Sequence, residues 1–141
     1  MDRIFLDANI LFSVAYGSLG LDRLWELARK KRCFLFASSY VVEEARRNLF
    51  DADRIKKLED CLLAVQIVPE VDLTIPCPID LPEKDRSVLL AAISIRAHYL
   101  LTGDTLHFGK YLGQTINGVK ICRPRDYLGR QKIRKPKTRL G

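Results

Sequence analysis

Apolar residues along the chain follow two alternating patterns. Short apolar runs predict strands that are buried on both faces, and longer stretches with apolar residues at helical spacing predict amphipathic helices. The predicted strands are residues 4–6, 33–37, 66–68, 99–102 and 119–122. The predicted helices are residues 21–28, 39–50, 54–65 and 83–97, with a helical or turn segment at 105–110 and a final helical turn at 123–128. This alternation predicts an α/β fold in which a parallel sheet has helices on both faces.

Two connections lack a hydrophobic period. Residues 13–20 are rich in small side chains, and we expect them to join the first strand to the first helix. Residues 69–82 contain Pro69, Pro76, Pro78 and Pro82, which predict an extended connection and a candidate flap beside a functional site. Trp25, in the helix at 21–28, is expected in the core rather than as a platform for a ligand.

The length of 141 residues predicts a single domain that can bury a core without disulfide bonds. We assign residues 1–129 to this domain and residues 130–141 to a basic tail. The formal net charge of +7 arises mostly in the tail, and the rest of the chain is nearly neutral. The tail is either a solvated chain end or an arm that contacts phosphates. As an arm, its candidate nucleic-acid-binding residues are Arg130, Lys132, Arg134, Lys135 and Lys137, and Arg139 adds a further positive charge.

The cysteines are scattered, at Cys33, Cys61, Cys77 and Cys122, and none forms a Cys-x-x-Cys pair. We interpret them as small buried hydrophobic residues or inert thiols, and reduced cysteines favour the cytoplasm. Charged residues interrupt the N-terminus, so no export signal is expected, and no apolar run approaches the ~18 residues of a membrane span. The sequence therefore predicts a soluble, cytoplasmic protein without a membrane partner.

Acidic residues occur where they can meet at one edge of the predicted sheet. Asp7 and Asp104 each follow a predicted strand, at the carboxyl end where open α/β sheets bind ligands. Asp85 begins the helix that leads into the second of those strands. Each acid alone has an ordinary explanation, because Asp is common in turns and at helix starts. If the two strands are neighbours, however, these carboxylates can converge on one crevice.

The helix predicted at 39–50 carries two adjacent glutamates. Glu43 falls opposite the apolar stripe of this helix, with Arg47 four residues on for an ordinary surface pair. Glu44 lies nearer the edge of the stripe, beside Asn48. The helical period therefore favours Glu44 as the inward carboxylate and leaves the register open by one residue.

Four carboxylates in one crevice would repel one another strongly, and no side chain is an obvious counter-ion for all of them. A divalent cation resolves this repulsion, and hard oxygen ligands favour Mg²⁺ or Mn²⁺. Such an ion activates a bound water and stabilises the leaving oxygen of a phosphodiester. The sequence contains no thiol or histidine cluster for zinc, no supported Ser-His-Asp set and no glycine-rich phosphate loop. The residues therefore favour metal-assisted hydrolysis of a phosphodiester.

The segments around these acids resemble the acidic motifs of PIN domains in their order and separation. They are residues 4–11 (IFLDANIL), 39–49 (SYVVEEARRNL), 84–92 (KDRSVLLAA) and 99–104 (YLLTGD). The resemblance covers about residues 3–128 and implies a three-layer α/β/α sandwich with a central, mostly parallel sheet. It also implies a ribonuclease that depends on Mg²⁺ or Mn²⁺. By position it assigns the catalytic, metal-binding acids as Asp7, Glu44, Asp85 and Asp104, with Asn9 and Thr102 as supporting residues.

The resemblance has consequences for partners. Many stand-alone PIN proteins of this size are VapC-type toxins, so RNA is the expected substrate, an antitoxin protein is a candidate partner and a homodimer is a candidate assembly. Two other functions stay open. One is a PIN-fold module that binds RNA or antitoxin without cleavage, which the full set of acids disfavours. The other is a phosphoacceptor domain with Asp7 as nucleophile, which lacks adjacent acids and a partner lysine. His107 is assigned a supporting or surface role, with contact to the substrate left open.

Overall fold

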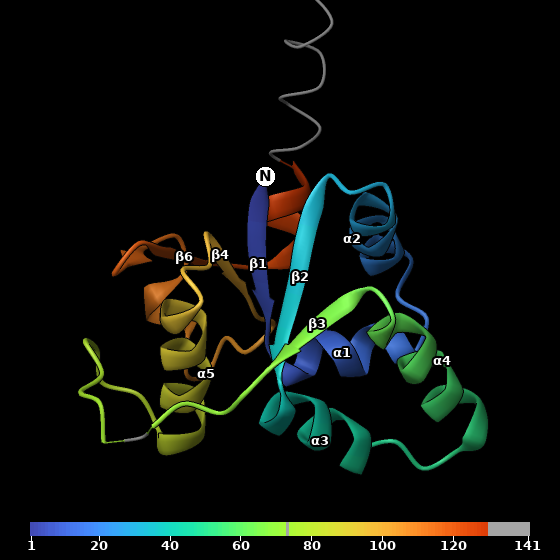
Figure 1. Ribbon diagram of the computed structural model, residues 1–141, viewed down its shortest axis with the longest axis horizontal. Helices are drawn as coiled ribbons and strands as arrows, with labels where there is room; N and C mark the ends of the chain where they lie inside the picture. Colours follow the sequence, from blue (N-terminus) through green and yellow to red (C-terminus); the bar gives the residue numbers. More distant parts are fainter. Residues whose placement is uncertain (73, 130–141) are drawn as a thin grey trace, which may run out of the picture.

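A six-stranded sheet forms the centre of the computed structural model, which describes residues 1–72 and 74–129 (Figure 1). The order of its strands is β3-β2-β1-β4-β6-β5, and each neighbouring pair is parallel except β5 and β6. The strands are β1 (Asp2–Leu6), β2 (Cys33–Ser38), β3 (Val65–Val68), β4 (Tyr99–Leu101), β5 (Thr115–Ile116) and β6 (Val119–Cys122). The predicted α/β class with a mostly parallel sheet is confirmed.

Helices fill the connections between the parallel strands. They are α1 (Ala8–Ala15), α2 (Leu19–Arg29), α3 (Ser39–Arg47), α4 (Ala52–Leu62) and α5 (Glu83–Ser94), with a short 3₁₀ helix η1 (Gly109–Tyr111) and helical residues at 124–129. The chain steps from β1 to β2 to β3 in one direction and back across the sheet to β4. Because such crossovers are right-handed, α1 to α4 cover one face and α5 covers the other. In Figure 1, α5 accordingly stands apart from the group formed by α1, α3 and α4.

Helix α1 corrects the prediction of a small-residue connection at residues 13–20. The Asp7 side chain caps this helix by accepting a hydrogen bond from the Ala8 backbone N–H. Ile10, Leu11 and Val14 are buried on its inner side. The prediction was wrong because only Asp7 and Asn9 interrupt the apolar residues at positions 4–12, where β1 passes into α1, so the change of period is hidden in one mostly apolar stretch.

Other elements also differ from the prediction in their bounds. The helix predicted at 39–50 ends at Arg47, where the Asn48 side chain donates to the Glu44 carbonyl at 2.8 Å. Val65 belongs to β3 rather than to the preceding helix. Strand β5 was not predicted, although the turn that joins it to β6 has a clear signal. Asn117 and Gly118 both have positive φ angles, as a two-residue hairpin turn requires.

The core lies on both faces of the sheet and includes the largest fully buried side chains, Trp25, Tyr127, Phe5 and Phe108. The predicted core position of Trp25 is confirmed, and its indole N–H donates to the Cys61 carbonyl at 2.9 Å. Three cysteines are buried, Cys77 is half-buried, and all are free thiols, as predicted. Within residues 1–72 and 74–129, no helix has the length and apolar character needed to cross a bilayer.

Candidate active site

The carboxyl ends of β1 and β4 meet because these strands pair in parallel, with Leu6 opposite Leu101. The residues that follow, Asp7 and Thr102, therefore leave the sheet at the same level. The backbone N–H of Asp7 continues the ladder by donating to the Leu101 carbonyl at 3.1 Å. The expected adjacency of the two strands is confirmed, and it brings two polar segments that are far apart in sequence to one edge of the sheet.

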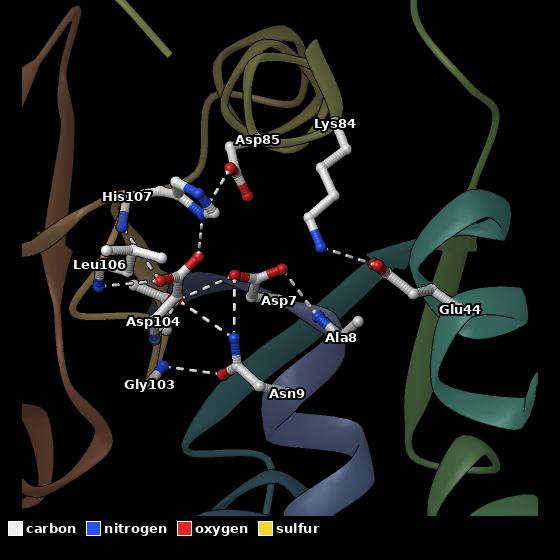
Figure 2. Close-up of polar contacts among 11 residues, drawn as sticks. Asp7, Ala8, Asn9, Glu44, Lys84, Asp85, Gly103, Asp104, Leu106 and His107 are labelled. Atoms are coloured by element: carbon white, nitrogen blue, oxygen red, sulfur yellow. Dashed lines mark hydrogen bonds and ion pairs between the residues drawn. The ribbon is translucent and has the colours of Figure 1, made fainter. Parts of the chain in front are cut away.

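Asp7 is held on both carboxylate oxygens. Its Oδ1 accepts from the Ala8 backbone N–H at 2.8 Å, and its Oδ2 accepts from the Thr102 hydroxyl at 2.8 Å and from the Asn9 amide at 3.1 Å (Figure 2). Burial raises the pKa of Asp7 above its ordinary value, although the Thr102 and Ala8 hydrogen bonds oppose this shift. The side chain is thus fixed in position and costly to ionise without a nearby positive charge.

Asn9 and Thr102 tie the loop after β4 to the start of α1. Asn9 Oδ1 accepts from the Gly103 backbone N–H at 2.7 Å, and the Thr102 hydroxyl accepts from the Asp104 N–H at 3.0 Å. Gly103 allows this close approach, because a Cβ atom there would lie 3.2 Å from Asn9 Oδ1. These contacts hold the backbone that carries Asp7 and Asp104.

Asp104 forms a tight turn with His107. Its Oδ1 accepts from the backbone N–H groups of Leu106 and His107, both at 3.0 Å, and its Oδ2 lies 2.9 Å from His107 Nδ1. Burial acts to raise the pKa of Asp104, but the hydrogen bonds and the charge of His107 outweigh burial and lower this pKa below its ordinary value. His107 therefore fixes the orientation of the Asp104 carboxylate.

Asp85 reaches the same space from the first turn of α5 (Figure 2). Its Oδ2 lies 3.1 Å from His107 Nδ1 but has no hydrogen-bond partner among the described residues. A ring nitrogen carries at most one hydrogen, and the bond to Asp104 uses it. The residue is only 2% exposed. Burial, followed by the charge of Asp7, raises the pKa of Asp85 to about 6.

Glu44 lies on the other side of the same space, on α3. Its Oε1 is 3.1 Å from the ammonium group of Lys84, and this contact raises the pKa of Lys84. The adjacent Glu43 instead points toward Arg46, at 2.6 Å, on the exposed side of the helix. The structure thus turns Glu44 inward and Glu43 outward.

These side chains surround one cavity of about 330 Å³, which we call the acidic cavity. Its lining consists of Asp7, Ala8, Asn9, Phe12, Glu44, Ala45, Asn48, Lys84, Asp85 and Asp104. The four predicted acids are therefore brought together, and Thr102 lies behind Asp7 rather than in the lining. No described residue of the proline-rich connection at 69–82 lines this cavity, so the structure does not place a flap there. The candidate nucleic-acid-binding residues of the tail lie outside the described residues.

Sequence reasoning missed two residues of this site. Lys84 lines the cavity directly beside Asp85, and Asn48 lines it beside Glu44. For Asn48 the signal was its place at the edge of the apolar stripe of its helix. For Lys84 no signal in the sequence distinguished it from an ordinary exposed lysine.

The residues present fit a divalent cation. Asp85, Asp104 and His107 each offer one ligand atom, and these atoms lie within 4.8 Å of one another. The free Oδ2 of Asp85 supplies a buried oxygen that needs a positive partner. Carboxylate oxygens are the ligands that Mg²⁺ and Mn²⁺ prefer. Because His107 Nδ1 is engaged with Asp104, the carboxylates are the ready donors in this arrangement.

The mostly parallel sheet and the acidic cavity at the carboxyl ends of its strands place this protein among α/β proteins with a candidate metal centre. The family model for the PIN domain matches residues 3–106, so the chain belongs to the PIN-domain family. The predicted resemblance is confirmed. Among solved structures, the chain is similar in fold to VapBC2 from Rickettsia felis, crystallised with a DNA fragment from its promoter. The TM-score is 0.60 and the identity 17%, over 86% of this chain and 98% of the other. No curated protein matches the sequence.

Proposed function

We propose that this protein is an endoribonuclease that uses a divalent cation, Mg²⁺ or Mn²⁺, to hydrolyse phosphodiester bonds in RNA. The observation that carries the proposal is the free Oδ2 of Asp85, which is buried in a cavity shared with three other acids. Ionised carboxylates this close repel one another, and a bound cation relieves that repulsion. Single-stranded or loop RNA is the substrate class in which an exposed backbone can reach such a cavity.

The ion would be held by Asp7, Asp85 and Asp104, with Glu44 on the opposite side of the cavity. When bound, such an ion lowers the pKa of a coordinated water and stabilises the leaving oxygen of the phosphodiester. The residues around the cavity would orient the acids that hold the ion. Asn9 and Thr102 fix Asp7, as their hydrogen bonds of 3.1 and 2.8 Å indicate.

The His107 ring contacts Asp104 Oδ2, while the backbone N–H groups of Leu106 and His107 donate to Asp104 Oδ1. Lys84 is the positively charged residue among the described residues that line the acidic cavity, so it is positioned to meet an entering phosphate. Glu44 holds the Lys84 ammonium at the cavity rim. The cavity thus combines carboxylates that would hold a metal ion with a lysine that can contact the phosphodiester.

The fold similarity to VapBC2 supports a biological setting for this activity. The protein is proposed to act as the toxin of a toxin–antitoxin pair in the cytoplasm, with an antitoxin protein as partner and a homodimer as its assembly. Co-expression with the protein encoded next to it, followed by co-purification, tests the partner. The molar mass of the protein in solution, which should equal that of two chains, tests the homodimer.

The substitution Asp7→Asn tests the nuclease. Wild-type protein with Mn²⁺ should cleave a mixture of single-stranded RNAs, and excess EDTA should abolish this cleavage. Asp7→Asn should lose cleavage with an unchanged circular dichroism spectrum, because it keeps the shape of the side chain and removes its charge. Asp60→Asn is the matched control, since Asp60 is exposed on α4 and away from the cavity.

Equal cleavage by Asp7→Asn, or by the wild type in EDTA, contradicts the proposed mechanism. RNA binding without cleavage by the wild type would instead indicate the alternative function, a PIN-fold module that binds RNA.

A further inference from the structure

A second cavity, of about 440 Å³, lies next to the acidic cavity. We call it the arginine cavity because its lining includes Arg123 and Arg125. Asn9 lines both cavities, and Gly103, whose N–H donates to Asn9, lines the second. The two cavities therefore share the Asn9 side chain, which lies just after the carboxyl end of β1.

The walls of the arginine cavity have two kinds of chemistry. One part is apolar and comes from three elements: Ile10 on α1, Leu21 on α2, and Pro124 and Leu128 in the helical segment at 124–129. Serines and glycines leave room between these side chains. A cavity of this size with an apolar wall and a few polar groups is typical of a small-molecule or nucleotide site.

The charge of this cavity is opposite to that of its neighbour. No acidic residue is among its described lining residues. Arg123 Nε donates to Asp126 at 3.2 Å, outside the lining. Arg125 is exposed and makes no ion pair or hydrogen bond to a side chain anywhere in residues 1–72 and 74–129. Among the described residues, Arg125 is thus an unpaired cation beside an apolar wall.

We infer that the arginine cavity is a subsite for the nucleotide that flanks the cleaved phosphodiester. The base of this nucleotide packs on the apolar wall, and its phosphate pairs with Arg125. Single-stranded RNA is recognised in this way, through unstacked bases held on apolar or planar side chains and through phosphate contacts. The inference rests on the proposed function, since it takes the cleaved phosphate to lie in the acidic cavity and a flanking nucleotide to lie beyond Asn9, which lines both cavities.

The opposite charges of the two cavities give the subsite a second role. A polyanion is repelled by the acidic cavity, where four carboxylates gather, until a cation is bound there. Arg125 attracts the strand independently of that cation. The subsite therefore contributes to RNA binding and to the direction in which the strand crosses the site, while the acids carry the chemistry.

The inference is tested by binding, with cleavage switched off. Full-length Asp7→Asn is titrated with fluorescent octauridylate in Mg²⁺ buffer at several salt concentrations, with and without Arg125→Gln. The added substitution should weaken binding by about three- to tenfold and reduce the slope of log K against log salt by about 0.7, as expected for one lost phosphate contact on a single strand. Arg32→Gln is the matched control, because this exposed arginine lies in the turn before β2, at the amino ends of the parallel strands and away from the cavity.

A second variant tests the apolar wall without changing charge. Ser13→Leu fills the arginine cavity from α1, where Ser13 is partly exposed, with a side chain on which a base cannot stack. Asp7→Asn should bind octauridylate more tightly than an abasic octamer with the same phosphates, and the added Ser13→Leu should remove this preference.

The results separate the subsite from the nuclease. If Arg125→Gln and Arg32→Gln give the same affinity and salt slope, the subsite is overturned, whether or not the wild type cleaves RNA. A protein segment as occupant would produce this same result. If Arg125→Gln weakens binding but the wild type never cleaves, the subsite stands and the proposed nuclease fails.

Discussion

Lys84 Nζ lies 3.1 Å from Glu44 Oε1, and this ion pair places a positive charge at the rim of the acidic cavity. The next residue, Asp85, is buried in the same cavity with a free carboxylate oxygen. One turn of α5 thus provides a lysine that pairs with Glu44 and an aspartate whose Oδ2 accepts no hydrogen bond among the described residues. This arrangement predicts that Lys84 competes with a divalent ion for the Glu44 side of the cavity.

Replacing Lys84 by methionine should therefore strengthen Mn²⁺ binding, because removal of a positive charge lowers the repulsion that the ion meets. We expect a gain of about three- to tenfold at low ionic strength, measured by Mn²⁺ titration with electron paramagnetic resonance. Lys30→Met is the matched control, since Lys30 pairs with Glu26 at 2.9 Å on an exposed helix surface. An unchanged Mn²⁺ affinity in Lys84→Met would show that Lys84 does not influence the ion.

The two adjacent glutamates of α3 should behave differently. Glu44→Gln should weaken Mn²⁺ binding and RNA cleavage by about tenfold or more, because it removes a carboxylate from the acidic cavity. Glu43→Gln should change either quantity by less than about twofold, because Glu43 pairs with Arg46 on the exposed side of the helix. Parallel titrations and cleavage assays of the two variants compare them directly. A larger effect of Glu43→Gln would reverse the assignment.

Much of the candidate site could be predicted because its residues follow local signals. Asp7 and Asp104 come directly after apolar strands, and the carboxyl ends of parallel strands meet at one edge. Glu44 was favoured over Glu43 by the helical period alone. These inferences need only short stretches of sequence and the rules of parallel sheets.

The remaining features depend on contacts between distant residues. Lys84 gains its role from Glu44, which lies 40 positions earlier in the chain. The position of His107 between Asp85 and Asp104 depends on how the loop after β4 packs under α5. These contacts are not present in a local hydrophobic pattern. Helix α1 was missed for a local reason, because Asp7 both ends β1 and caps the next helix, which leaves no gap between the two apolar periods.

Without a bound metal ion, the burial and mutual repulsion of the acids in the cavity should lower the free energy of unfolding. A buried carboxylate without a hydrogen-bond partner destabilises the fold when it is ionised. The pKa of Asp85 is raised to about 6, so the folded protein favours its protonated form, and the penalty is present at higher pH and fades as pH falls through 6 toward 4. In EDTA at pH 8, Asp85→Asn should therefore raise the free energy of unfolding by roughly 1–3 kcal/mol.

Thermal denaturation in EDTA, with and without added Mn²⁺, measures this effect. Mn²⁺ should raise the Tm of the wild type and have little effect on Asp85→Asn, because a ligand that binds the folded state stabilises it. Asp60→Asn, on the exposed surface, should match the wild type in both conditions. A lower Tm for Asp85→Asn in EDTA would mean that Asp85 is already compensated within the fold.

The helical segment at 124–129 is tied to β1 by Tyr127, whose hydroxyl donates to Asp2 Oδ2 at 2.8 Å. Burial and this hydrogen bond raise the pKa of Tyr127, so the folded state favours the neutral phenol. The stabilisation is therefore complete below the ordinary tyrosine pKa of about 10 and is lost as the pH rises above it. Tyr127→Phe should lower the free energy of unfolding by about 1 kcal/mol at pH 8, since it removes the hydrogen bond and keeps the edge-to-face contact with Tyr99.

Urea unfolding of the wild type and Tyr127→Phe at pH 8 and pH 11 tests this contact. The wild type should lose more stability than the variant between the two pH values, because only the wild type can ionise residue 127 when it unfolds. The titration of lysines and other tyrosines affects both proteins equally and cancels in the comparison. An equal loss in the two proteins would show that the folded state does not raise the pKa of Tyr127, either by burial or by the hydrogen bond to Asp2.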